Sequence, residues 1–170
     1  MKKVYFVFCI LFAYVIHGQN KPKTLVILNN ENIGYKDGQG VLNPIKQEDI
    51  ATLSVLKEDA FEKYGSKSGV VFITTKKFVI DTFYKNNIEN SELKKKIPTK
   101  ESLAKIGIIG RKAESKNQPY EELTKYINIS LEENDVQKIA SISFVEPSVA
   151  VKINPDWKFG AIEIMSTKDK

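Results

Sequence analysis

The sequence contains one cysteine and one histidine among its 170 residues. These residues, Cys9 and His17, both lie near the N-terminus, where two lysines precede the apolar run Val4–Ile16. An apolar run of this length, followed by the small residue Gly18, is typical of a secretory signal peptide. The run is shorter than the roughly 20 apolar residues of a membrane-spanning helix. We therefore predict that residues 1–18 are a cleaved signal peptide, with retention as an uncleaved anchor as the alternative.

Export would remove the only thiol and the only imidazole from the chain. Their loss excludes disulfide bonds, Cys/His zinc sites, Cys–His nucleophiles and Ser–His–Asp triads. Soft and borderline metals prefer sulfur and imidazole ligands. We therefore expect no tightly bound zinc or copper, and no cofactor.

Arginine is equally scarce, because Arg111 is the only one and lysine supplies the other basic side chains behind the net charge of +5. Nucleic-acid surfaces usually combine arginine with aromatic residues, so no nucleic-acid partner is expected. The one run of like charges, Lys94–Lys96, is typical of a solvated turn before Pro98.

Catalytic motifs are missing as well. The chain has no Gly-x-Ser-x-Gly elbow and no Gly-x-Gly-x-x-Gly fingerprint. Gly65–Gly69 looks superficially like a phosphate loop, but it lacks the required spacing and its helix precedes it. Glu132, Glu133 and Asp135 cluster at an expected helix start, where acidic residues are common. We therefore predict that the protein is not an enzyme.

What the sequence does contain is a strand–helix–strand pattern over Asp49–Lys76. Ile50–Leu56 alternates with a period close to two, as a strand with one buried face does. Gly65 follows a short helical segment and suits the left-handed conformation that ends many helices. After Gly69, the β-branched run Val70–Thr75 is typical of a strand covered on both faces.

Several residues of this stretch carry a resemblance to a known family. They are Ile50, Leu53, Val55, Leu56, Lys57, Ala60, Tyr64, Gly65, Gly69, Val70, Ile73, Thr75 and Lys76. In order and spacing they resemble the closing part of the plug domain of TonB-dependent outer-membrane receptors of the polysaccharide-uptake type. The resemblance covers about a sixth of the chain, and the link Ser66–Ser68 is shorter than the family's. It implies a plug-like module, whereas the receptor barrel needs many more strands than this chain is expected to form.

Short elements are expected around this stretch. Thr24–Leu28 should be a core strand, with a TonB box, the peptide that such receptors offer to their energy coupler, as the weaker alternative. Tyr35–Gly40 is polar and glycine-rich, which favours a loop. Ile45–Asp49 should form one helical turn, and Phe78–Ile80 should extend the preceding strand.

The middle of the chain alternates between polar and apolar segments. The expected elements are a weak helix over Ile88–Lys96, a helix capped by Thr99 and ending at Leu103, a strand over Ile106–Ile109, a loop over Lys112–Gln118, a helix from Pro119 and a strand over Tyr126–Leu131. Because Pro98 ends a helix, the best domain boundary lies at Ile97–Lys100.

The last third of the chain repeats the strand–helix–strand pattern. Ile139–Val145 aligns with Ile50–Leu56, and Gly160–Lys168 mirrors Gly69–Lys76, with a helix over Ser148–Lys152 between them. Chance similarity between two such units is the alternative. A single unit of this size buries too little apolar surface to fold alone, whereas two can cover each other or share one sheet.

The second copy is degenerate. Asn154 stands where the first copy has the capping Gly65, and Glu163 stands where it has Phe72, so one face of the last strand should be exposed. We predict an α+β fold with two plug-like units of mixed sheet and short helices. The units are expected at residues 19–97, with a core at 24–76, and at residues 98–170, with a core at 126–168.

These observations favour an exported, non-enzymatic binding module of the periplasm, outer membrane or cell surface of a Gram-negative envelope. The alternative is an accessory component of a TonB-dependent uptake system that acts with a separately encoded barrel. The expected partner is an envelope protein, docking by strand addition if Val70–Thr75 or Ala161–Met165 is a sheet edge; the oligomeric state is left open. The candidate contact aromatics are Tyr35, Tyr84, Tyr120 and Trp157, although a core or loop-anchoring role is favoured for each.

Overall fold

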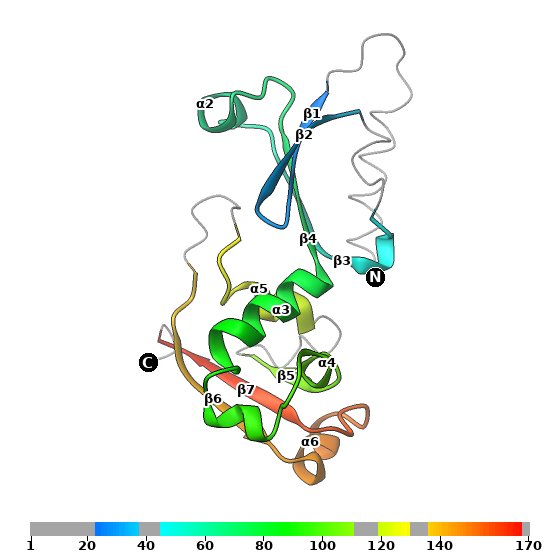
Figure 1. The fold of residues 1–170 in the computed structure, drawn as a ribbon, viewed down its shortest axis with the longest axis vertical. Coiled ribbons are helices and arrows are strands. Elements are labelled where there is room, and N and C mark those ends of the chain that lie inside the picture. The colour runs from blue at the N-terminus through cyan, green and yellow to red at the C-terminus, as the bar shows by residue number, and fades with distance from the viewer. Residues whose placement is uncertain (1–22, 38–44, 111–118, 130–135, 168–170) are drawn as a thin grey trace. The chain divides into compact units, whose positions relative to one another are not determined.

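The computed structural model describes residues 23–37, 45–110, 119–129 and 136–167 (Figure 1). Within them the chain has two mixed sheets and short helices, which confirms the predicted α+β class. It divides into two compact units, Met1–Thr74 (unit 1) and Thr75–Lys170 (unit 2). The predicted signal peptide, the loop at 112–118 and the acidic residues at 132–135 lie outside the described residues.

Unit 1 contains one four-stranded sheet. Its strands are β1 (Thr24–Leu28), β2 (Glu31–Lys36), β3 (Ile50–Leu56) and β4 (Val70–Thr75), in the order β2-β1-β4-β3. β1 is parallel to β4 and antiparallel to β2. The 3-10 helix η1 (Gln47–Asp49) precedes β3, and the helix α2 (Ala60–Tyr64) lies between β3 and β4 in the chain. The predicted strand–helix–strand order is therefore confirmed.

The strand β2 corrects one expectation, because Tyr35 and Lys36 belong to it and not to a loop. The signal for this strand lies in the turn before it, where Asn29 and Asn30 have φ values of 50° and 71°. Two central residues with positive φ form the tight turn that joins hairpin strands, and asparagine adopts this conformation more readily than most residues. The turn brings β2 back along β1.

The core of unit 1 lies on β1 and β4. Val26, Val71 and Ile73 are each at most 2% exposed. Partly buried side chains pack against them: Leu28, Ile33, Ile45, Ile50 and Leu53. β1 is thus a core strand, paired on both sides, and not a free peptide of the TonB-box kind.

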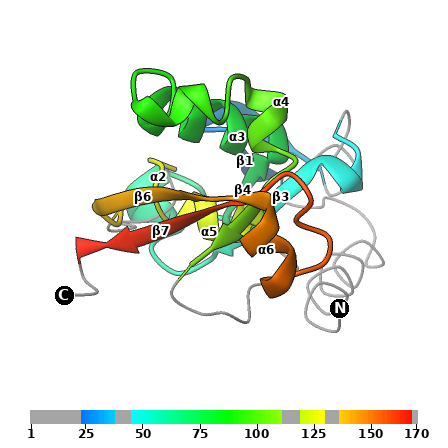
Figure 2. The same cartoon turned by 90° about the horizontal axis from the view of Figure 1, so that it is seen from below.

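Unit 2 contains a three-stranded sheet and most of the helical residues. Its strands are β5 (Gly107–Ile109), β6 (Ile139–Val145) and β7 (Ala161–Ser166), and its helices are α3 (Lys76–Asn87), η2 (Glu92–Lys95), α4 (Lys100–Leu103), α5 (Pro119–Thr124) and α6 (Pro147–Ile153). The strand order is β5-β7-β6, with β7 parallel to β5 and antiparallel to β6 (Figure 2). Phe83, Leu103, Leu123 and Ile162 are among the fully buried side chains of this unit.

The helix α3 corrects the expectation that Phe78–Ile80 extends a strand. The Thr75 hydroxyl accepts a hydrogen bond from the Phe78 backbone N–H at 3.2 Å, which caps the helix. Val79, Ile80, Phe83 and Tyr84 are all buried, and their spacing places them on one helical face. A window of three residues is too short to show helical periodicity. Over the longer segment this periodicity favours a helix.

The boundary between units also differs from the predicted one. The chain divides between Thr74 and Thr75, and not at Ile97–Lys100. The reason is that α3 packs against α4 and α5, so it belongs with the elements that follow it. Pro98 ends a turn inside unit 2 and marks no division.

The predicted strand at Tyr126–Leu131 is not formed over its described residues, 126–129. The Tyr126 and Ile127 N–H groups donate to the carbonyls of Leu123 and Thr124, at 3.1 and 3.4 Å, so the chain coils at the end of α5. Both side chains are buried, which removes the alternation of a half-exposed strand.

Neither strand that was considered as a docking edge lies at an edge. β4 is flanked by β1 and β3, and β7 is flanked by β5 and β6. Strand addition at Val70–Thr75 or Ala161–Met165 is therefore wrong. The edges of the described sheets are β2 and β3 in unit 1, and β5 and β6 in unit 2.

Candidate interaction surface

The residues that resemble a receptor plug form the framework of unit 1 and the start of unit 2. Ala60, Val70, Ile73 and Gly69 are buried, and Ile50 and Leu53 pack against the core. Leu56, Tyr64, Thr75 and Lys76 are half-buried, whereas Val55, Lys57 and Gly65 are exposed. The Tyr64 ring meets the Phe72 ring edge-on, with centroids 5.6 Å apart. Most of the motif therefore specifies packing.

The loop that follows α2 is closed by its own hydrogen bonds. Gly65 has a φ of 68°, and its N–H donates to the Phe61 carbonyl at 2.9 Å, which confirms it as the left-handed end of the helix. The buried Ser66 hydroxyl donates to the Gly69 carbonyl across the loop. Since these polar groups are used internally, Gly65–Gly69 is a structural turn and not an anion cradle.

One glycine in each unit holds the same position. Gly69 and Gly160 have φ values of 90° and 94°, and each directly precedes the last strand of its unit. A Cβ atom on Gly69 would lie 2.9 Å from the Leu56 carbonyl oxygen, and one on Gly160 would lie 2.8 Å from the Val145 carbonyl oxygen. Leu56 and Val145 are the last residues of β3 and β6. The predicted repeat thus recurs in backbone conformation and contact.

The repeat also includes a strand that the sequence comparison missed. β1 pairs in parallel with β4, starting at Leu25 opposite Val70, and β5 pairs in parallel with β7, starting at Gly107 opposite Ala161. Strand orders β1-β4-β3 and β5-β7-β6 therefore correspond. The sequence signal for this strand is the pair of short apolar runs Thr24–Leu28 and Ile106–Ile109.

The predicted equivalence of Asn154 and Gly65 is wrong in one respect. Asn154 has a φ of −144°, which is extended backbone, whereas Gly65 is left-handed. The Asn154 N–H donates to the Ala150 carbonyl at 2.9 Å, so the second helix ends without a left-handed residue. Glu163 is exposed, as predicted for one face of β7.

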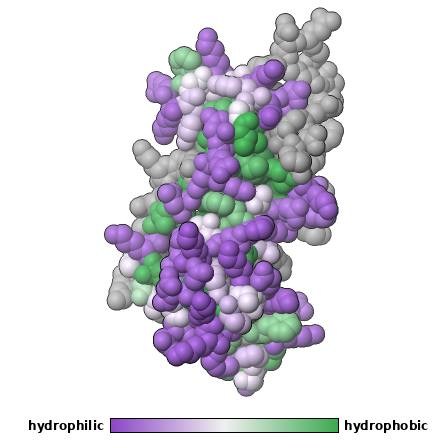
Figure 3. Space-filling model, viewed as in Figure 1, coloured by the Kyte–Doolittle hydropathy of each residue, from purple (hydrophilic) through white to green (hydrophobic). Residues whose placement is uncertain are grey.

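The helices of the two repeats leave apolar side chains in solvent. α2 and α6 each bury a single residue, Ala60 or Ala150. In unit 1, Phe61 is 59% exposed. In unit 2, the exposed apolar side chains of α6 and the turn after it are Val149, Val151, Ile153 and Phe159, the last at 63%. Figure 3 shows such apolar (green) surface among hydrophilic side chains. We call the unit 2 group the α6 tip.

All four candidate contact aromatics have contacts within the protein, and Tyr35 is the most exposed of them. Tyr84 is 4% exposed, and its hydroxyl donates to the Pro98 carbonyl at 2.7 Å. Trp157 packs so closely over Gly107 that a Cβ there would lie 2.2 Å from the indole. The Lys76 ammonium lies 5.4 Å from the centre of the Tyr120 ring. Tyr35 is 49% exposed, with its hydroxyl 3.4 Å from the Gly65 carbonyl oxygen.

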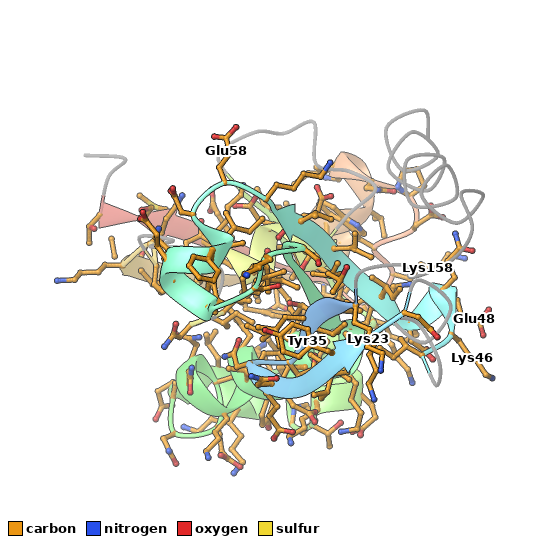
Figure 4. The ribbon with its side chains drawn as sticks, turned by 90° about the horizontal axis from the view of Figure 1, so that it is seen from above. Lys23, Tyr35, Lys46, Glu48, Glu58 and Lys158 are labelled. Carbon is orange, nitrogen blue, oxygen red and sulfur yellow. The ribbon has the colours of Figure 1, made fainter. Side chains whose placement is uncertain are left out.

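Glu48 and Glu58, two acidic residues next to β3, do not converge (Figure 4). In Figure 4 the side chains of Glu48 and Glu58 project from the ribbon before and after β3. Paired carboxylates that exchange protons must lie close together. These two residues therefore do not form such a pair.

The acidic residue Asp81 has shifted ionisation through its lysine neighbours. Burial alone would raise the pKa of Asp81, but the hydrogen bond from Lys77 and the charge of Lys100, 3.4 Å away, outweigh it and lower the pKa. The same hydrogen bond raises the pKa of Lys77. The cluster joins α3 to the start of α4 and is a structural ion-pair group.

Glu122 is a buried acid that the sequence reasoning did not single out. It is 2% exposed, accepts a hydrogen bond from the Tyr126 hydroxyl at 3.2 Å and pairs with Lys125. A Cβ on Gly110 would overlap its carboxyl group, so the glycine makes room for it. The spacing of Glu122, Lys125 and Tyr126 along one helical turn was the available signal. A carboxylate with these partners stabilises α5.

Metal-ligand groups, membrane-spanning helices and similar proteins give this surface no further functional assignment. Among the described residues no group of His, Cys, Asp or Glu is arranged to hold a metal ion. None of the helices in the described part of the chain is long and apolar enough to cross a membrane. Comparison of the chain with protein-family models, curated proteins and solved structures finds no match.

Proposed function

We propose that the protein is an exported, non-enzymatic binding module whose two units resemble receptor plug domains and which docks on another protein of the bacterial envelope. The observation that carries the proposal is the α6 tip, where Val149, Ile153 and Phe159 are 45–63% exposed within one short segment. Exposed apolar groups gathered in one place are characteristic of protein-binding surfaces. The resemblance of Asp49–Lys76 supplies the envelope context.

The partner that the resemblance to receptor plugs suggests first is a separately encoded outer-membrane barrel. A plug gates a pore only inside a barrel, and the resemblance to receptor plugs gives a reason to look for one. The proposal does not require it, because the α6 tip can bind any envelope protein with a complementary apolar patch.

Capture from detergent-solubilised envelope extract tests the proposal. The exported chain should retain a specific envelope protein, and the double substitution Ile153→Ser/Phe159→Ser should reduce the captured amount at least fivefold. Met165→Ser is the matched control, since Met165 is 48% exposed on β7, outside the α6 tip. Equal capture by all three proteins would contradict the role of the tip, and a measurable hydrolytic turnover would end the non-enzymatic proposal.

A further inference from the structure

Each sheet has one protected edge and one unprotected edge. β2 carries Glu31 and Lys36, and β5 has only three residues. The opposite edges, β3 and β6, are seven-residue strands with the sequences IATLSVL and IASISFV. Charges, proline, short length and β-bulges are the usual means of keeping an edge from pairing with another chain. β3 and β6 have none of the first three, and the one irregularity in the pairing of β6 lies at its start, between Ile139 and Ser141.

The strand β6 is bounded by opposite charges. Lys138 precedes it and Glu146 follows it, and both are exposed. The Glu146 carboxylate accepts a hydrogen bond from Lys96 at 2.7 Å. A carboxylate has a second oxygen and further lone pairs, so it can accept from another lysine as well.

Antiparallel pairing of two β6 strands brings complementary residues together. With Ile142 at the centre, Lys138 of each copy comes to the end of the ladder where Glu146 of the other lies, and the irregularity between Ile139 and Ser141 offsets the two from direct opposition. Ser141 of one copy faces Ser143 of the other, and both serines are exposed. Opposite charges and hydroxyl pairs stabilise such cross-strand positions. The regular part of β6, Ser141–Val145, supplies the edge, because the irregularity in its pairing with β7 lies between Ile139 and Ser141.

Other pairings of the unprotected edges are mostly disfavoured by charge. β3 is bounded by Asp49 and Lys57, in the opposite order to β6. Antiparallel pairing of β3 with β6 would place Asp49 against Glu146, and like charges in directly opposed positions are destabilising. Parallel pairing of two β6 strands would oppose Lys138 to its own copy. Parallel pairing of β3 with β6 is complementary, and so is antiparallel pairing of two β3 strands, which places Asp49 against Lys57. These are the alternatives that must be tested.

We propose that two copies of this chain associate through their β6 edges, antiparallel and centred on Ile142, so that two three-stranded sheets become one of six. The contact gives the protein a self-association surface that adjoins the α6 tip, since Glu146 is the N-cap of α6, but that uses different residues. Figure 1 shows β6 on the side of β7 away from β5. The added strand would pair with the opposite edge of β6, the edge that faces away from β7.

Charge reversal with the exported chain tests the pairing. Sedimentation equilibrium should show a concentration-dependent dimer of the natural sequence. Lys138→Glu and Glu146→Lys should each raise the dimer dissociation constant at least tenfold, because each places like charges at both ends of the ladder. An equimolar mixture of the two single variants should form a heterodimer, and the double variant K138E/E146K should dimerise again. Lys105→Glu, an exposed charge reversal outside β6, should have no such effect.

The outcomes separate this proposal from its alternatives. A monomer at all concentrations up to about 1 mM, the concentration of a very weak complex, would overturn it. A dimer that neither Lys138→Glu nor Glu146→Lys weakens would also overturn it, because that result is expected of β3–β3 pairing. A further pattern would overturn it as well: the equimolar mixture of Lys138→Glu and Glu146→Lys stays monomeric, but adding Asp49→Lys to the Lys138→Glu chain restores association. That pattern indicates parallel β3–β6 pairing. Melting temperatures within a few degrees of the natural protein would show that loss of dimer is not loss of fold. Capture of an envelope partner is measured separately, so either result can fail alone.

Discussion

At the residue scale, Gly69 is a position where a single added methyl group should be poorly tolerated. Its φ of 90° is rarely adopted by residues with a side chain, and a Cβ there would lie 2.9 Å from the Leu56 carbonyl oxygen. That oxygen belongs to the backbone of β3 and cannot move without disturbing the sheet. We expect Gly69→Ala to lower the free energy of unfolding by about 3 kcal/mol, measured by urea denaturation.

Gly65→Ala is the matched control for this prediction. Gly65 also has a positive φ, 68°, but a Cβ there would meet nothing within 4 Å. The substitution should therefore cost only the strain of the left-handed conformation, about 1–2 kcal/mol. Equal losses for the two alanines would mean that the contact with Leu56 is unimportant.

Thr74 offers a substitution that should stabilise the protein. It is 1% exposed, and its hydroxyl oxygen has no hydrogen-bond partner in the described part of the chain. A buried polar group without a partner costs free energy that a methyl group does not. We expect Thr74→Val, which keeps the β-branched shape that β4 needs, to raise the free energy of unfolding by about 1 kcal/mol. A lower melting temperature for the variant would contradict this account.

At the element scale, the connection between α3 and α4 should depend on pH through Asp81. Its pKa is lower in the folded protein than in the unfolded chain, so its contribution to stability is present above the unfolded pKa and is lost as the pH falls through the folded pKa. We expect Asp81→Asn to cost about 0.5–1 kcal/mol at neutral pH. The difference between the two proteins should vanish in acid, below the ordinary carboxyl range.

The pair of Glu92 and Lys95 on η2 provides the control. Both side chains are more than three-quarters exposed, and exposed pairs contribute little. Glu92→Gln should leave the melting temperature unchanged at neutral pH. A loss as large as that of Asp81→Asn would show that exposure does not distinguish the two pairs.

The sequence predicts the elements that depend on local signals and misses those that depend on pairing. β3, α2 and β4 follow from alternation, from Gly65 and from a β-branched run, and all are confirmed. β2 was missed because its hairpin depends on the left-handed conformation of Asn29 and Asn30, which asparagine allows but does not require. Phe78–Ile80 was assigned to a strand because a three-residue window cannot distinguish a buried helix from a buried strand.

The candidate surface was less predictable than the fold. Exposure of Phe61 or Phe159 depends on what the rest of the chain covers, and a sequence pattern does not give that. Strand order has the same dependence. The sequences of β4 and β7 are compatible with either an edge or a central position in a sheet. Only the pairing with β1 and β5 places them at the centre.

At the scale of the whole molecule, each unit has its own sheet and its own buried residues, so we expect two separable unfolding transitions. Trp157, the only tryptophan, packs on Gly107 within unit 2, and its fluorescence therefore reports on that unit. Gly69→Ala should shift part of the circular-dichroism transition while leaving the tryptophan transition in place. Gly160→Ala should shift the tryptophan transition instead. Coincident shifts for both variants would show that the chain unfolds as one cooperative structure.

The central position of β4 and β7 has a consequence for how the protein assembles. Each is the last strand of its unit along the chain, and each joins strands that are not paired with each other. The paired residues of β1 and β4, and those of β5 and β7, lie roughly 45 to 55 residues apart along the chain. Pairings between such distant residues form slowly. A chain that enters a compartment from its N-terminus can make the β1–β2 hairpin at once. It cannot complete either sheet until the final strand of that unit has arrived.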